Sequence, residues 1–94
     1  MGYRVRKAEF ERRKAATAEE IGEWDRAIGA MVAASRKARR ITQQGLADEI
    51  GWTRNQVANL KHGRASVRVS QLIVIAKAVG EQPEKLFSRI LHFR

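Results

Sequence analysis

The chain contains no cysteine, a single proline and no long apolar run. Without cysteine there is neither a disulfide framework nor a thiolate metal site. No apolar stretch approaches the roughly 18–20 residues that span a bilayer, and the charged N-terminus lacks the apolar centre of a signal peptide. These absences argue against a disulfide-stabilised secreted scaffold and an integral membrane protein. We therefore expect a cytoplasmic protein associated with the nucleoid.

Acidic side chains are scarce and unevenly placed. Ten acidic residues stand against nineteen Lys and Arg, which gives a net charge of +9. From Arg26 to Gly80 only Asp48 and Glu49 are acidic, against ten Lys and Arg. This distribution favours a basic face that displaces counterions from a polyanion, although a merely solvated basic surface is the alternative. The basic stretches lack the interleaved Trp, Phe and Leu of a membrane-surface helix, so no membrane partner is expected.

The apolar spacing predicts an all-α domain. No segment shows sustained period-two alternation, whereas apolar residues recur at three- and four-residue spacings from Ile21 to Ser35. Thr17 and Glu20 fit a capping box that would start this helix, and Gly22 or Gly29 would break it. The first fourteen residues, with six basic and two acidic side chains, would form a flexible arm or a short helix at residues 8–16.

Four further short helices follow. Thr42 and Thr53 are placed to cap two of them, which would end at glycines 51 and 63. A third helix carries Leu72, Ile75, Ala76 and Val79 and ends at glycine 80, and Pro83 would open the last one. The sequence therefore predicts five helices after the arm.

The helix that Thr53 would start has a distinctive outer face. At 100° per residue, one arc about 140° wide carries Arg54, Asn55, Ala58, Asn59 and His62. Val57 and Leu60 lie on the opposite side. Exposure to solvent alone does not explain why Arg and two Asn surround one small alanine. This face is therefore a candidate binding surface.

Residues 42–51 read TQQGLADEIG and residues 52–63 read WTRNQVANLKHG. These segments resemble the Cro/repressor-type (XRE-like) helix-turn-helix family, and the match runs without gaps from Ile28 to Phe87, over 60 of the 94 residues. The resemblance implies a compact five-helix repressor-like domain at residues 24–94, preceded by a basic arm or helical extension at residues 1–23. With no Cys, only two distant His and no glycine-rich phosphate loop, we expect neither a metal site nor a cofactor.

Four residues depart from the family pattern. Ser35 stands where a core Leu is usual, Val67 where Pro is common, and Met31 and Val74 where Arg is frequent. We expect Met31 or Val74, or both, to be covered by the N-terminal extension through Trp24 and Ile21 or by a second subunit. The alternative is that both are isolated exposed apolar residues, which are normal.

In this family the second helix of the motif enters the major groove. Arg bonds guanine with two parallel donors and Asn bonds adenine as donor and acceptor, while a small residue allows close approach to a thymine methyl. The candidate base readers are therefore Arg54, Asn55, Asn59 and Ala58.

Other side chains would hold the DNA backbone without reading sequence. Capping alone suffices to explain Thr53, and His62 is equally well an ordinary exposed histidine. The candidates are Gln43, Thr53, Gln56, Lys61, His62, Arg64 and Arg68.

Basic side chains near the N-terminus could insert into a minor groove or lie along phosphates, or they could be a disordered solubility tail. They are Arg4, Arg6, Lys7, Arg12, Arg13 and Lys14. The last helix is the candidate dimer surface, through Leu86, Phe87, Ile90, Leu91 and Phe93.

The resulting hypothesis is a sequence-specific transcriptional repressor, of phage or small prokaryotic type, that binds a palindromic operator in double-stranded DNA as a homodimer. The alternative is an antitoxin that represses its own operon and holds a toxin through its N-terminal or C-terminal helices. A protein-interaction module without DNA binding is less favoured because the candidate reading face is not acidic or apolar. An RNA-binding role is less favoured because no aromatic stacking platform is visible. An enzyme is not expected, because Asp48 and Glu49 diverge by about 100° on a helix and no nucleophile system can be assembled.

Overall fold

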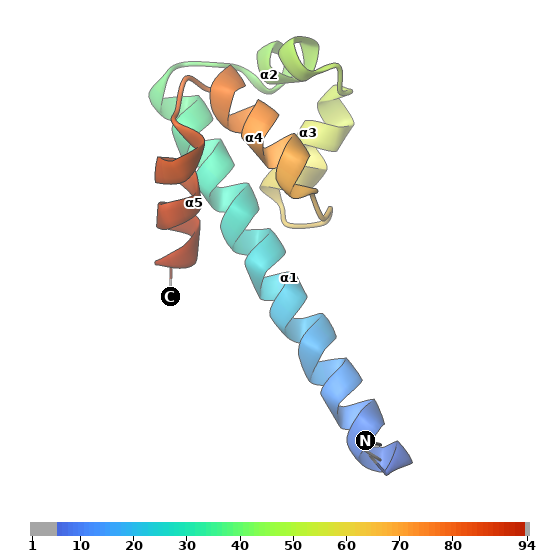
Figure 1. Cartoon of the computed structure of the whole chain (residues 1–94). Coiled ribbons are helices and arrows are strands. Elements are labelled where there is room, and N and C mark those ends of the chain that lie inside the picture. The colour runs from blue at the N-terminus through green and yellow to red at the C-terminus, as the bar shows by residue number, and fades with distance from the viewer. Residues whose placement is uncertain (1–5, 94) are drawn as a thin grey trace.

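The computed structural model describes residues 6–93 and consists of helices joined by short connections (Figure 1). Within this range there are five helices and no strand. They are α1 (Lys7–Ala38), α2 (Gln43–Ile50), α3 (Arg54–Lys61), α4 (Val69–Ala78) and α5 (Pro83–Leu91). The predicted all-α architecture is confirmed. Arg4 lies outside the described residues.

The first helix differs from the prediction. α1 is continuous over 32 residues and begins at Lys7, so Thr17 lies inside it and caps nothing. The predicted start at Thr17 and the predicted break at a glycine are therefore wrong. Alanine, Lys, Arg and Glu dominate residues 7–20 and are good helix formers, so the helix continues through a weak local start signal. This one helix crosses position 23, and the proposed division there stays a prediction.

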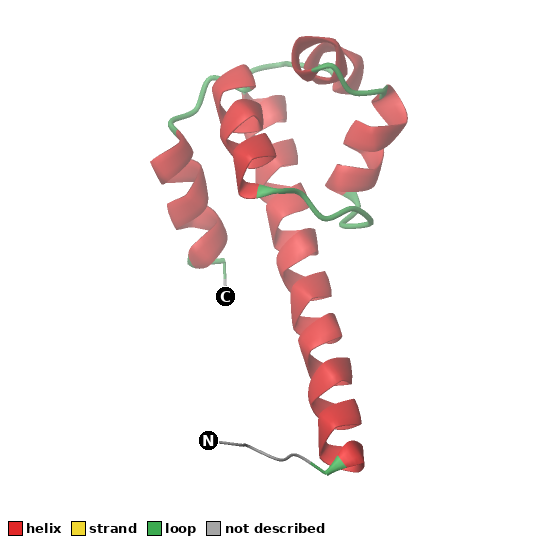
Figure 2. Ribbon diagram, turned by 45° about the vertical axis from the view of Figure 1, so that its right-hand side comes forward, coloured by secondary structure: helices red, strands yellow, loops and turns green. Residues whose placement is uncertain are grey.

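The start and stop signals of the shorter helices are confirmed. The Thr42 hydroxyl accepts a hydrogen bond from the Gly45 amide at 2.9 Å, and Gln82 precedes Pro83 at the start of α5. Gly51 ends α2 with a φ of 73°, in the left-handed region that glycine enters at no steric cost. Because each connection is short, α2 to α5 pack around only one half of α1 (Figure 2).

The core forms where the apolar faces of all five helices meet. Its largest fully buried side chains are Leu46, Leu60, Ile75, Leu86 and Val79. Trp24, Ile28 and Met31 of α1 pack against it while partly buried. Burial of these side chains is the main favourable term in folding at about 25 cal/mol per Å² of apolar surface.

α1 and α3 approach closely at Gly29. A methyl group at position 29 would lie 2.0 Å from the carbonyl oxygen of Leu60, and one at Gly63 would lie 2.5 Å from Cγ of Arg26. Gly63 also has a φ of 68°, which disfavours a side chain independently. The two glycines therefore allow the C-terminal end of α3 to rest against the backbone of α1.

A polar group inside the fold joins α1 to α5. The Ser35 hydroxyl donates to the buried carboxylate of Glu81 at 2.5 Å and accepts from Arg89 at 2.6 Å. Arg89 also forms an ion pair with Glu81. Ser35 therefore replaces an apolar core contact with a hydrogen-bonded one, and the three groups satisfy one another.

The close approach at Gly29 predicts the effect of a single methyl group. We expect Gly29→Ala to lower the free energy of unfolding by about 1–3 kcal/mol or more, because the added methyl meets rigid backbone. Gly22→Ala is the matched control, since the nearest atom there is the flexible end of Arg26 at 3.5 Å. It should instead stabilise by up to about 1 kcal/mol through helix propensity. Urea unfolding measures the free energy of unfolding of both variants. Equal effects of the two substitutions would contradict the close approach of α1 and α3 at Gly29.

The buried carboxylate predicts a pH dependence. Burial by itself raises the pKa of Glu81, but hydrogen bonds from Ser35 and Arg89, with the Arg89 and Arg39 charges, hold it below its ordinary value of 4.5. Its contribution to stability is therefore complete above about pH 4.5 and is lost as the pH falls through the lowered value. We expect Glu81→Gln to lose roughly 1–3 kcal/mol at pH 7 and to flatten this acid dependence. Glu84 is exposed, so Glu84→Gln should change neither the stability at pH 7 nor the acid dependence.

Candidate nucleic-acid interface

The structure places the side chains of α3 as the helical period predicts. Val57 and Leu60 are buried, while Arg54, Asn55 and Asn59 are exposed, and Ala58 is partly buried between them. The predicted arc is therefore one continuous exposed face on a helix whose opposite face is anchored in the core.

The beginning of α3 is fixed by a reciprocal cap. The Thr53 hydroxyl accepts from the Gln56 amide at 3.2 Å, and the Gln56 side-chain oxygen accepts from the Thr53 amide at 2.7 Å. This capping box satisfies two backbone donors of the first turn and orients the exposed face. Gln56 is thus engaged within the chain through its oxygen, and its amide group retains two donors for a phosphate.

The end of α3 gathers positive charge. Lys37 of α1, together with partial burial and Arg36, lowers the pKa of the Lys61 amine. Like charges held this close favour an anion between them. His62 and Arg64 follow as exposed residues. Lys37 was missed as a site candidate, although the acid-free run of residues 36–40 was its signal.

The connection from α3 to α4 is held against α1. The Ser66 hydroxyl donates to the Asp25 carboxylate at 2.7 Å. Arg68, exposed, precedes α4, and its amide donates to the Gln71 side chain at 2.9 Å. Gln43, partly buried, is the first residue of α2. The predicted backbone candidates therefore lie at the start of α2, along α3 and in the connection that follows it.

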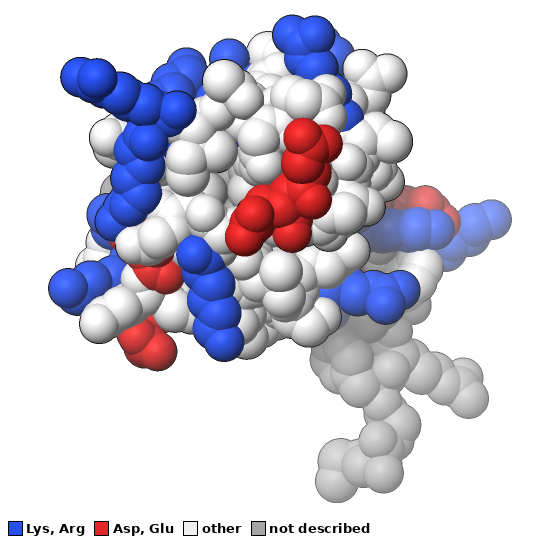
Figure 3. All heavy atoms as spheres, turned by 90° about the horizontal axis from the view of Figure 1, so that it is seen from above, with Lys and Arg blue, Asp and Glu red and all other residues white. Residues whose placement is uncertain are grey.

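The face that carries α2 shows the charge distribution directly. Lys and Arg side chains stand around its edge, and a group of acidic side chains lies within it (Figure 3). The two acidic residues of α2, Asp48 and Glu49, are exposed.

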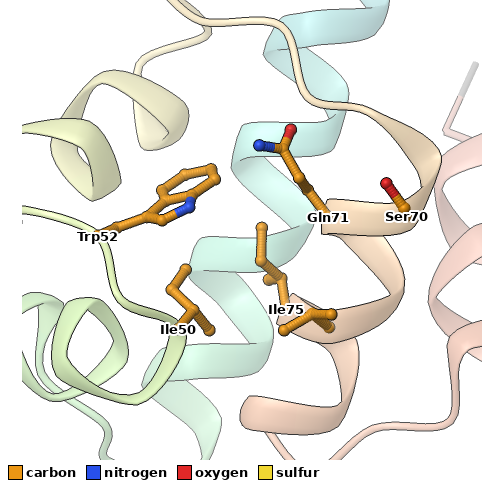
Figure 4. Close-up of a pocket in the computed structure, with 6 residues that line it drawn as sticks. Ile50, Trp52, Ser70, Gln71 and Ile75 are labelled. Carbon is orange, nitrogen blue, oxygen red and sulfur yellow. The ribbon is translucent and has the colours of Figure 1, made fainter.

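A hollow of about 240 Å³ lies between the helix-turn-helix segment and α4. Ile50 and Trp52 face Ser70, Gln71 and Ile75 across it (Figure 4). Val74 lines the same hollow and is 53% exposed, so α1 does not cover it, whereas Met31 is partly buried against the core. Met31 is thus partly covered within its own chain, and cover of Val74 by a second subunit stays a prediction. Trp24 packs beside the same core, whereas Ile21 is exposed.

The N-terminal basic residues are not brought to α3. Arg6 precedes α1, and Lys7, Arg12, Arg13 and Lys14 lie in its first turns. α3 rests on α1 near Arg26 and Gly29, at least twelve residues further along. At 1.5 Å per residue this separation is about 18 Å.

The predicted dimer surface is partly wrong. Leu86 and Ile90 are buried within this chain, because α5 packs that face on α1 and α4. Leu91 and Phe93 are exposed and Phe87 is partly buried, so these three remain available.

Residues 32–86, more than half of the chain, match the helix-turn-helix family. The chain belongs to this family. Members are non-enzymatic DNA-binding regulators, and membership supports a DNA-binding transcriptional regulator. No curated protein sequence matches the chain.

The solved structures that are similar to this chain include two regulators. The clp gene regulator ClgR from Corynebacterium glutamicum has a TM-score of 0.69 at 20% identity, over 72% of this chain and 72% of its own. The restriction-modification controller protein C.AhdI from Aeromonas hydrophila has a TM-score of 0.63 at 25% identity, over 67% of this chain and 96% of its own. The similarity to ClgR, at 20% identity, shows only that the fold is shared.

Among residues 6–93, no helix has the length and apolarity that crossing a membrane requires. The same residues contain no group of three or more His, Cys, Asp or Glu placed to hold a metal ion.

Proposed function

We propose that the chain is a sequence-specific transcriptional repressor that reads the major groove of double-stranded DNA with α3. The observation that carries this proposal is the exposed face of α3, with Arg54, Asn55 and Asn59 around Ala58. An Arg fork matches guanine and an Asn amide matches adenine, whereas Ala58 leaves room for the helix to sit deep in the groove. Both regulators of similar fold are named as controllers of genes or of restriction-modification, which supports the role.

The flanking side chains would hold the phosphate backbone. Lys61, with Lys37 beside it, ends α3 and Arg64 follows it, Arg68 precedes α4, and Gln43 begins α2. Such contacts release counterions, so binding weakens with a log–log salt slope of about −0.9 per phosphate neutralised. His62 and Thr53 lie beside these groups, but Thr53 is already occupied by capping. This role places the protein with DNA in the cytoplasm.

We further propose that two copies bind a palindromic operator. A two-fold pair presents recognition helices about 34 Å apart, one turn of DNA. α4 and α5 offer an apolar hollow of about 190 Å³ lined by Val69, Leu72, Phe87, Ile90 and Leu91. Val69 and Leu91 are each 66% exposed there, which suits contact with a second copy. The antitoxin alternative stays a prediction.

Selection from random duplexes, repeated with single variants, tests base reading. We expect Arg54→Ala to remove the preference at one base pair at a cost of roughly 1–3 kcal/mol, whereas Arg64→Ala weakens all duplexes equally and lowers the salt slope by about 0.9. Lys85→Ala on α5, exposed and away from α3, is the charge-matched control. Equal affinity of the unaltered chain for all duplexes would overturn the proposal.

Sedimentation equilibrium with and without operator DNA tests the α5 contact. We expect Leu91→Glu to weaken self-association at least tenfold (about 1.4 kcal/mol) because a carboxylate would enter an apolar contact. Leu91→Met should retain it. If Leu91→Glu associates as the unaltered chain does, α5 is not the dimer contact.

A further inference from the structure

The N-terminal half of α1 extends beyond the packed domain. We call residues 7–24 the α1 stem. From residue 7 to residue 20 every side chain is exposed except the partly buried Glu9. The described chain measures 50 × 26 × 23 Å, and the stem projects from the packed domain along the long dimension (Figure 1). A surface helix usually gains its stability by burying an apolar face.

The stem carries a row of side chains that is apolar at its two ends, at Phe10 and at Ile21 and Trp24, and polar at Lys14 and Thr17 between them. The residues of this row recur every three or four positions along the stem. They continue, toward the N-terminus, the row of Ile28 and Met31 that packs on the core. Phe10 is 56% exposed and Ile21 51% exposed. The full row is Phe10, Lys14, Thr17, Ile21 and Trp24. The face that is buried in the domain therefore continues along the stem, where Phe10 and Ile21 are exposed.

The charge of the stem changes sign along its length. Residues 6–14 carry five basic and two acidic side chains, whereas residues 15–25 carry four acidic and no basic ones. Two stems side by side in parallel would set like charges against each other. In antiparallel order the basic part of each would face the acidic part of the other, which is favourable.

The middle of the stem pairs a long side chain with a short one. Lys14 and Thr17 are the central residues of the row, and the alanines at positions 15, 16 and 18 lie outside the row. With Phe10 opposite residue 21 of a second copy, residue 14 lies opposite 17 and residue 7 opposite 24, which keeps the whole row in contact. The overlap then ends at Trp24, where the packed domain begins, after about 27 Å.

We propose that the α1 stem binds a second copy of the chain as an antiparallel helix pair, with Phe10 against Ile21 of the partner subunit. This contact is separate from the hollow between α4 and α5. A chain that uses both contacts therefore joins one pair of copies to another. The proposal does not depend on DNA binding, because the stem and α3 lie on different parts of the chain.

The absence of native cysteine allows a direct test in the full chain. A Phe10→Cys chain is mixed with an Ile21→Cys chain, oxidised mildly, and the products are counted by mass. A disulfide requires Cα atoms within about 7 Å, and antiparallel pairing separates identical positions 10 by about 16 Å along the axis. We expect the mixed disulfide to exceed either self-disulfide at least tenfold, as these distances require.

In the control, the two cysteines lie at matching heights along the helix pair but on the sides of the helices that face away from the contact. Ala15→Cys mixed with Ala16→Cys occupies equivalent heights in the pair, but the two positions lie away from the row. This mixture should give no excess. Self-linking of Phe10→Cys alone, or a mixed yield no greater than the control, would overturn the antiparallel pair. Binding of each variant to DNA, measured beside it, reports on the proposed function separately.

Discussion

The carbonyl oxygen of Leu60 occupies the place that a side chain at position 29 would need, and the arrangement of the domain depends on the glycine found there. Because α3 rests directly on the α1 backbone, its position does not vary with side-chain rotamers at that point. Gly63 repeats the contact one turn of α1 away, at Arg26. Val57 and Leu60 then enter the core together, and the opposite face of α3 can only point outward. The exposed Arg and Asn side chains are thereby held on a rigid element.

Much of the fold could be predicted because its signals are local. Thr42, Thr53 and Pro83 each act within one turn of their own helix, and the three-four spacing identifies Leu46, Val57 and Ile75 as core. The start of α1 could not be predicted in this way, because one capping pattern competes with the propensity of the whole run. Gly29 was interpreted as a weak point since its neighbour, Leu60, lies 31 residues further along.

The same distinction separates the predictions about the site. The exposed arc of α3 follows from helical period alone and is confirmed as a surface, while base reading stays a prediction. Leu86 and Ile90 share a helix with Leu91, and only tertiary packing shows that α5 buries the first two. The contact of Ser35 with Glu81 and Arg89 spans 46 and 54 residues, and no local pattern in the sequence indicates it.

The continuity of α1 has a consequence for how the stem is maintained. An isolated helix must first form a costly nucleus of about one turn, and short helices are marginal in water for that reason. In this chain the nucleus is supplied by residues 27–36, which the core already holds in helical form. The stem therefore needs only propagation, so its order is coupled to that of the domain. Any partner that binds the helical stem therefore also stabilises the domain to which the stem is joined.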